Sequence, residues 1–369
     1  MAAKKAKGEL DRGVRWTPEL RAEVWSERGR VVPEFQDKAL EDARDPRAAF
    51  EQRADYARRG KYGGSRVALE PKLRAGLAKA DARARAWTEA ALDACEEKTP
   101  PRALDADVEA TMVALELVPV FAAFPFWLSH AGPELAMRAL VLSHRRWSSA
   151  RRHGYGSSIV LVVDDTCAGD EPEYADSAWR MLRAVVAEAD DATYARLRAQ
   201  AERLREGAPA PVVSYLSVAF PSEAAWAAEA ADAAIARGEA AAGWERMLVT
   251  ATDLDRAERL ARSGDWELDE DMLLTVLARH GGDGARVIAA AIDAASNNEH
   301  RKDYAKLLSI VENELAARAF ARALSVKAIA PVAQKWFKRV PEVARPALEA
   351  IVREAGPSAK AARIVLDAL

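Results

Sequence analysis

Residues 331–369 read PVAQKWFKRVPEVARPALEAIVREAGPSAKAARIVLDAL, and this stretch decides the expected fold. Apolar residues recur in it at helical spacing, with Val343, Ala347 and Ile351 four positions apart. A helix with one apolar stripe must bury that stripe against another element. Because proline and glycine interrupt the stretch at short intervals, we expect short helices that stack on one another.

The remainder of the chain repeats this pattern. Helix starts recur about every 15 residues, so helix pairs recur about every 30, as in helical-repeat proteins. The sequence has no fixed-period signature of tetratricopeptide or ankyrin repeats. We therefore expect an all-α protein built as a degenerate HEAT-like array of helix pairs (an α-solenoid). The N-terminal part either joins this array or forms a separate helical bundle.

Composition shifts predict four segments in the chain. Residues 1–12 are expected to be a disordered basic tail, and residues 13–155 an N-terminal helical region. Residues 156–176 are irregular and acidic, which predicts a connection between the two halves. Residues 177–369 then hold the C-terminal HEAT-like repeats.

Capping residues predict where individual helices begin and end. Thr17 before Pro18 favours a helix start, because the Thr side chain caps the first turn and proline suits its first position. Asp190 predicts another start in the same way. His280, just before Gly281, is typical of a helix C-terminus, where the dipole favours a cation and glycine ends the helix.

The overall composition favours a protein of the cytoplasm. Of the 369 residues 50% are apolar, and the formal charge is -3, which gives no general attraction to polyanions or anionic lipid. The two cysteines, Cys95 and Cys167, have no metal-binding spacing and fit a reducing compartment. The most apolar window, residues 112–128, contains Glu116 and two prolines, so we expect a core segment and no membrane span.

One basic stretch, residues 138–155, nominates a binding site. It contains Arg145, Arg146, Arg151 and Arg152 beside an aromatic residue, a pattern that can bind phosphates and stack on bases. The acids that follow within residues 164–176 offer an alternative, in which they neutralise the arginines inside the same fold. Both interpretations stay open at this point.

No residue pattern nominates a catalytic, cofactor-binding or metal site. An apolar run ends in Asp164-Asp165, as the magnesium-binding strand of a P-loop enzyme does, but the sequence has no GxxxxGK[ST] loop to accompany it. The five histidines form no HExxH motif. We therefore expect no cofactor and no metal.

The C-terminal stretch also carries a family resemblance. Trp336-Phe337, the prolines at Pro341 and Pro346 with their apolar neighbours, and the run Ala359 to Leu369 resemble HEAT-like helices of one family. These helices precede the DUF4132 domain in large bacterial proteins related to the molybdate metabolism regulator. The sequence has no Trp-Gly-Arg motif of the domain that often opens such proteins, and it stops where DUF4132 would start.

The predicted function is that of a non-catalytic helical-repeat scaffold for protein–protein interaction. The alternative is binding of a nucleic acid or other polyanion through the four arginines. A third class, an enzyme with an unrecognised site, has no candidate residues. Leu366 and Leu369 extend an apolar stripe to the last residues, which predicts self-association or cover by another part of the protein as a further possibility.

Overall fold

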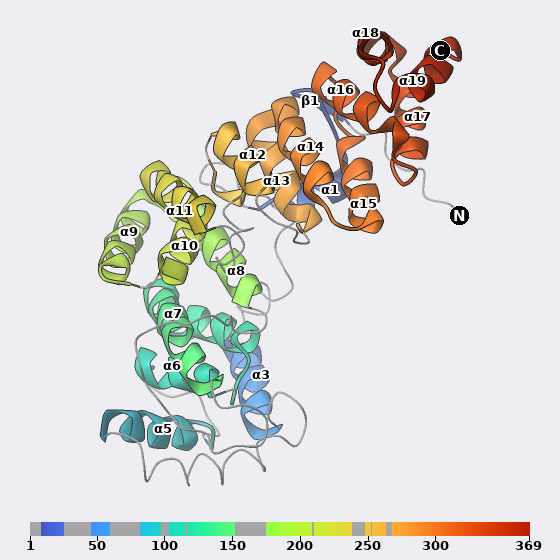
Figure 1. The fold of residues 1–369 in the computed structure, drawn as a ribbon. Coiled ribbons are helices and arrows are strands. Elements are labelled where there is room, and N and C mark those ends of the chain that lie inside the picture. Colours follow the sequence, from blue (N-terminus) through green and yellow to red (C-terminus); the bar gives the residue numbers. More distant parts are fainter. Residues whose placement is uncertain are drawn as a thin grey trace. The chain divides into compact units, whose positions relative to one another are not determined.

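The computed structural model describes residues 9–25, 46–59, 82–96, 103–115, 117–151, 175–208, 210–237, 248–251, 253–262 and 268–369. These residues are mostly helical, and the one sheet among them is a two-stranded hairpin (Figure 1). The all-α prediction is therefore confirmed. None of the described helices is long and apolar enough to cross a membrane.

The chain divides into two compact units. One combines Met1–Trp25 with Glu223–Leu369, and we call it the discontinuous unit; the other, Ser26–Ser222, is the central unit. This division differs from the expected boundary at residues 156–176, most of which lie outside the described residues. The reason is that the helices following this segment pack back onto the long helix before it, and so belong to the central unit.

The central unit is built around α7 (Val120–Arg151), which contains a break at Gly132. The helices α3 (Pro46–Arg59) and α6 (Ala106–Ala114) pack against α7, and α5 (Ala82–Ala94) packs against α6. The helix α7 also contacts α8 (Ala175–Glu188), α9 (Asp191–Arg205) and α10 (Ala210–Ala219). The apolar window at residues 112–128 contributes to this core as expected: of its four aromatic residues Phe124, Phe126 and Trp127 are fully buried, and Phe121 is half-buried.

An ion pair lies inside the core of the central unit. Arg53 on α3 and Glu109 on α6 are 1% and 3% exposed, with Arg53 Nη2 2.5 Å from Glu109 Oε1 and Nε 3.1 Å from Oε2. Trp127 Nε1 donates to Glu109 Oε2 at 2.7 Å, and the Arg53 guanidinium lies 4.8 Å from the centre of the Phe126 ring. A buried charge is tolerated only when its partners are satisfied, so this cluster fixes how α3, α6 and α7 pack.

The discontinuous unit contains a regular succession of short helices. They are α11 (Ala224–Arg237), α12 (Leu254–Arg262), α13 (Glu270–His280), α14 (Ala285–Ala294), α15 (Asn298–Leu308), α16 (Glu314–Arg322), α17 (Ala330–Arg339), α18 (Pro341–Glu354) and α19 (Ala359–Asp367). Alternate helices contact one another: α12 meets α14, α14 meets α16, and α16 meets α18. A second set follows the same rule, since α13 meets α15 and α15 meets α17.

The C-terminal helices bury most of the stripe that their sequence predicts, although Val343 is only half-buried. Ala344, Ala347, Leu348 and Ile351 are the buried residues of α18. Before them, Trp336 packs against Phe320 and Phe337 with ring centres 5.4 and 5.6 Å away, and its Nε1 donates to Val311 O at 2.9 Å. In α19, Ala362 and Val365 are buried, Leu366 and Leu369 are half-buried, and Ile364 is 61% exposed.

A hairpin near the N-terminus belongs to the same unit. The strands β1 (Glu9–Asp11) and β2 (Val14–Trp16) pair antiparallel, and α1 (Pro18–Ala22) follows with Thr17 as its predicted N-cap. Residues 9–12 were expected in a disordered tail, and this part of the prediction is wrong. The strands are only three residues long, too short for an alternating pattern to stand out.

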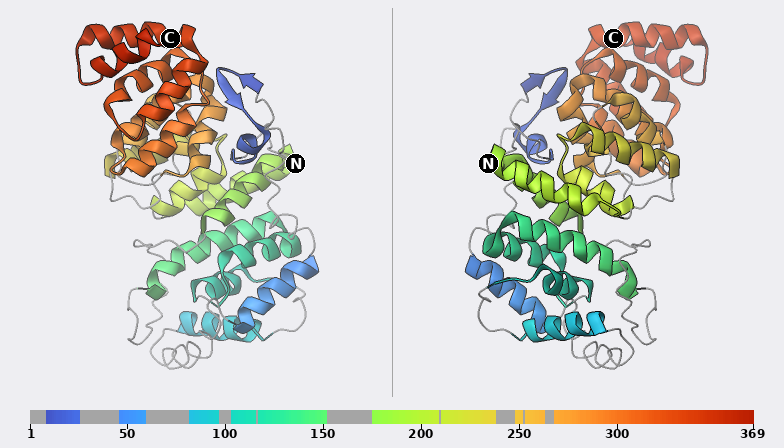
Figure 2. Two further views of the ribbon diagram at one scale, coloured as in Figure 1. Left: turned by 90° about the vertical axis from the view of Figure 1, so that its right-hand side faces the viewer. Right: turned by 90° about the vertical axis from the view of Figure 1, so that its left-hand side faces the viewer.

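Backbone hydrogen bonds attach this hairpin to the segments that follow α13 and α15, and Figure 2 shows the hairpin beside helices of this unit. Arg15 N donates to Ile310 O at 2.7 Å, and Gly282 N donates to Arg12 O at 2.7 Å. Arg15 also forms a two-pronged ion pair with Glu312, with both distances 2.9 Å. The N-terminal segment is thereby part of the C-terminal helical array.

Candidate functional site

The four arginines singled out in the sequence are on or next to α7. Arg145 is half-buried, and its Nη2 donates to Leu204 O at 3.2 Å, in the last turn of α9. Carbonyls in the last turn of a helix lack intrahelical donors, so Arg145 supplies one within the central unit. The side chains of Arg146 and Arg151, and the whole of Arg152, lie outside the described residues. Polyanion binding through this group stays a prediction.

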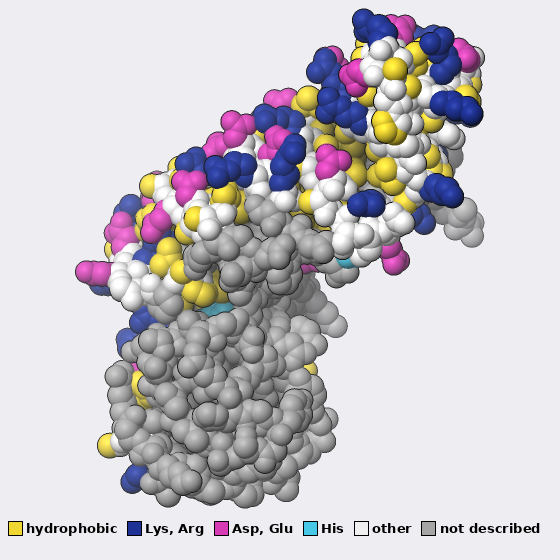
Figure 3. All heavy atoms as spheres, viewed as in Figure 1, with side chains coloured by type: hydrophobic (Ala, Val, Ile, Leu, Met, Phe, Trp, Pro, Cys, Tyr) yellow, Lys and Arg dark blue, Asp and Glu magenta, His cyan; other side chains and the backbone are white. Residues whose placement is uncertain are grey.

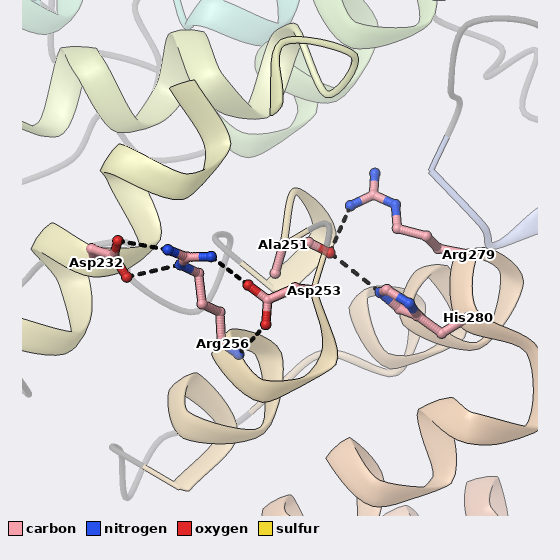
Figure 4. A network of polar contacts seen from close by, with 6 residues as sticks. All are labelled: Asp232, Ala251, Asp253, Arg256, Arg279 and His280. Carbon is pink, nitrogen blue, oxygen red and sulfur yellow. Dashed lines mark hydrogen bonds and ion pairs between the residues drawn. The ribbon is translucent and has the colours of Figure 1, made fainter. Parts of the chain in front are cut away.

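A polar network connects α11 with the start of α12 (Figure 4). Arg256 binds both oxygens of Asp232, at 2.8 and 3.0 Å, and its Nη1 lies 2.5 Å from Asp253 Oδ2. Asp253 also accepts from the backbone N–H of Arg256 at 2.9 Å, which makes it the cap of α12. The hydrogen bond from the Arg256 side chain lowers the pKa of Asp232, and the backbone hydrogen bond does the same for Asp253.

The other half of Figure 4 concerns the end of α13. Arg279 Nη1 donates to Ala251 O at 3.0 Å, and His280 Nε2 lies 3.3 Å from the same oxygen. The helix ends at His280 with Gly281 as its C-cap, as the sequence predicts. The polar groups in Figure 4 bond to one another and hold neighbouring segments together. We therefore look for a binding site elsewhere in this unit.

A groove crosses α12, α14 and α16 on the surface of the discontinuous unit. Its volume is about 210 Å³, and its apolar lining includes Ala289, Ala319 and Phe320. Its charged lining consists of Arg262, Arg286, Arg318, Arg322, Glu258 and Asp293. Figure 3 shows basic and acidic side chains next to one another over these helices. The groove therefore combines small apolar residues with a rim in which arginine predominates.

The acidic side chains at one end of the groove are already bound. Glu258 accepts from Arg262 Nη2 at 2.6 Å and from Arg286 Nη2 at 2.7 Å. Arg286 also donates to Asp255 at 2.9 Å, and the hydrogen bonds that Arg286 donates to Asp255 and Glu258 raise its pKa. These pairs join α12 to α14 and hold the Arg286 side chain in place beside the groove.

The other end of the groove has two exposed arginines one turn apart on α16. Arg318 is 59% exposed and pairs with Glu314, which is on the same helix and 64% exposed. Arg322 is exposed, and among the described residues no carboxylate lies within ion-pair distance of its guanidinium. Residues four apart lie on one face of a helix, so both guanidinium groups lie on the same side of α16. The spacing is readable in the sequence, but their position beside a groove is not.

The remaining candidate features concern metal ions and magnesium-dependent chemistry. Among those residues, no group of three or more His, Cys, Asp or Glu side chains could hold a metal ion. Asp164 and Asp165, which end the apolar run noted in the sequence, lie outside the described residues. Comparison with protein-family models, curated proteins and solved structures found no match. The resemblance to the DUF4132-related proteins stays a prediction.

Proposed function

We propose that the discontinuous unit is a degenerate HEAT-like array whose role is to bind a partner protein. The alternating contacts support this assignment: α12 meets α14 and α14 meets α16, while α13 meets α15 and α15 meets α17. In an array of this kind each repeat contacts mainly its neighbours, and the stacked helices present an extended surface. A non-catalytic scaffold in the cytoplasm fits this arrangement, and the buried free thiol of Cys95 fits a reducing compartment.

The observation that carries the proposal is the groove over α12, α14 and α16. Small side chains at Ala289 and Ala319 leave space between helices whose rims are charged. Protein interfaces commonly combine a central apolar contact with a polar rim, and arginine is enriched in them. A partner segment lying in this groove would bury the apolar floor and meet the arginines at its edge.

Affinity capture with two matched variants tests this function. Ala289→Phe fills the groove, whereas Ala361→Phe places the same ring at a half-buried position on α19, outside the groove lining. We expect proteins captured by the unmodified chain to be lost with Ala289→Phe and retained with Ala361→Phe, provided that circular dichroism shows both variants folded. Equal capture by both variants would overturn the proposal.

A further inference from the structure

We propose that the groove over α12, α14 and α16 binds an acidic peptide segment that inserts one apolar side chain between its arginines. This inference rests on the proposed function and names the class of partner. It is argued from three properties of the groove: its charge, its size and the positions of its acids.

The charge of the lining favours an anionic partner. Four arginines line the groove against two acids, and two further acids beside the lining, Asp255 and Glu314, pair with Arg286 and Arg318. Arg322 has no ion pair among the described residues, and the exposed pair between Arg318 and Glu314 is of a kind that contributes little. A carboxylate that binds at α16 can therefore pair with Arg322 directly. It can also replace Glu314 as the partner of Arg318 at a small cost in free energy.

The size of the groove favours a side chain over a cofactor. Pockets for cofactors and drug-sized molecules commonly enclose roughly 300–1,000 Å³, whereas this groove has about 210 Å³. Its floor is formed by half-buried apolar residues, including Ala289, Leu315 and Ala319. An aliphatic or aromatic side chain inserted there would be removed from water, while its flanking residues stayed at the level of the arginines.

The acids within the lining favour a peptide over a nucleic acid. Glu258 and Asp293 both line the groove, and Glu258 pairs with Arg262 of α12 and Arg286 of α14. The continuous phosphate backbone of a nucleic acid would run against these carboxylates. A peptide places its charges at separate positions, so its own acids can meet Arg318 and Arg322 and avoid Glu258.

The test is a selection of random linear peptides on the full chain, followed by affinity measurements by fluorescence anisotropy. We expect enriched peptides to carry several Asp or Glu residues around one large apolar residue. The double variant Arg318→Ala/Arg322→Ala should weaken their binding about tenfold and reduce its salt dependence. Lys335→Ala/Arg363→Ala removes the same charge from exposed positions outside the groove and should change affinity less than twofold.

The outcomes separate this inference from the proposed function. One outcome is that the enriched peptides lack acidic residues and lose binding with Ala289→Phe but not with the double arginine variant. This result would overturn the proposal that the partner is acidic, while the scaffold function would remain supported. If Ala289→Phe removes the binding of none of the enriched peptides, both this inference and the proposed function are overturned. Tight binding of a fluorescent single-stranded oligonucleotide, weakened by the double arginine variant and in competition with the peptides, would overturn the choice of a peptide.

Discussion

The contact between the N-terminal hairpin and the end of α13 leads to a specific prediction for Gly281→Ala. Gly281 has φ +61° and ψ −146°, a backbone conformation that is open to glycine and strained for residues with a Cβ. A Cβ at this position would lie 2.8 Å from Arg12 Cβ and 3.2 Å from Arg12 O. The substitution therefore strains the backbone and also pushes against the turn of the hairpin.

The expected cost follows from these two effects. A residue held in a sparsely populated backbone region costs about 1–3 kcal/mol. An added group in a well-packed contact costs about 1–3 kcal/mol, and part of this is relieved when the hairpin moves away. Moving away breaks the 2.7 Å hydrogen bond from Gly282 N to Arg12 O, which contributes about 1 kcal/mol. We expect a total of about 2–4 kcal/mol, which lowers the midpoint of thermal unfolding by about 5–15 °C.

Gly356→Ala is the matched control, because a Cβ at Gly356 meets nothing within 4 Å. Calorimetry should show a loss of stability for Gly281→Ala that the control lacks. Hydrogen exchange should show faster exchange at the amides of Arg15 and Glu312, which the hairpin contact protects. If the two variants have stabilities within about 0.5 kcal/mol of one another, the reasoning about the hairpin contact is refuted.

Three further predictions concern other contacts. Glu109→Ala leaves Arg53 as a buried unpaired charge and should cost about 3–5 kcal/mol in denaturant unfolding, whereas a variant with both residues replaced by apolar ones should be closer to the original. Arg256→Met removes the partner that lowers the pKa of Asp232. A carboxyl whose pKa is lowered in the folded state stabilises the fold above pH 3.8, and this stabilisation is lost as the pH falls through the lowered pKa. The difference in unfolding midpoint between the original chain and Arg256→Met should therefore narrow from neutral pH to about pH 3. Ala355 ends α18 with φ +52°, so Ala355→Gly should stabilise the chain by about 0.5–1 kcal/mol in thermal unfolding.

Each of these has an outcome that would contradict it. A Glu109→Ala variant as stable as the original would mean that water reaches Arg53. If the difference in unfolding midpoint between the original chain and Arg256→Met stays constant down to pH 3, the ion pair with Asp232 does not contribute to stability in solution. Destabilisation by Ala355→Gly would show that the positive φ at this position carries no strain worth relieving.

The sequence alone determined the helical class and many helix ends of this protein. Apolar spacing in residues 331–369 is a local property that follows from 3.6 residues per turn, so the buried face of α18 could be read directly. Caps are local as well: Thr17, Asp190 and Gly281 act on backbone groups within a few residues, and all three are found where the sequence places a helix end.

The tertiary structure decided which segments meet. The sequence does not show that residues 9–16 pair with the loop around Ile310. Nearly every residue has the same backbone N–H and C=O groups, so residue types do not specify which backbone groups bond to each other. The same holds for the groove, where Arg318 and Arg322 become a candidate site only because α14 and α16 pack side by side with small residues between them. Local spacing fixes the face of a helix, and long-range packing, which depends on the whole core, selects the neighbour that covers it.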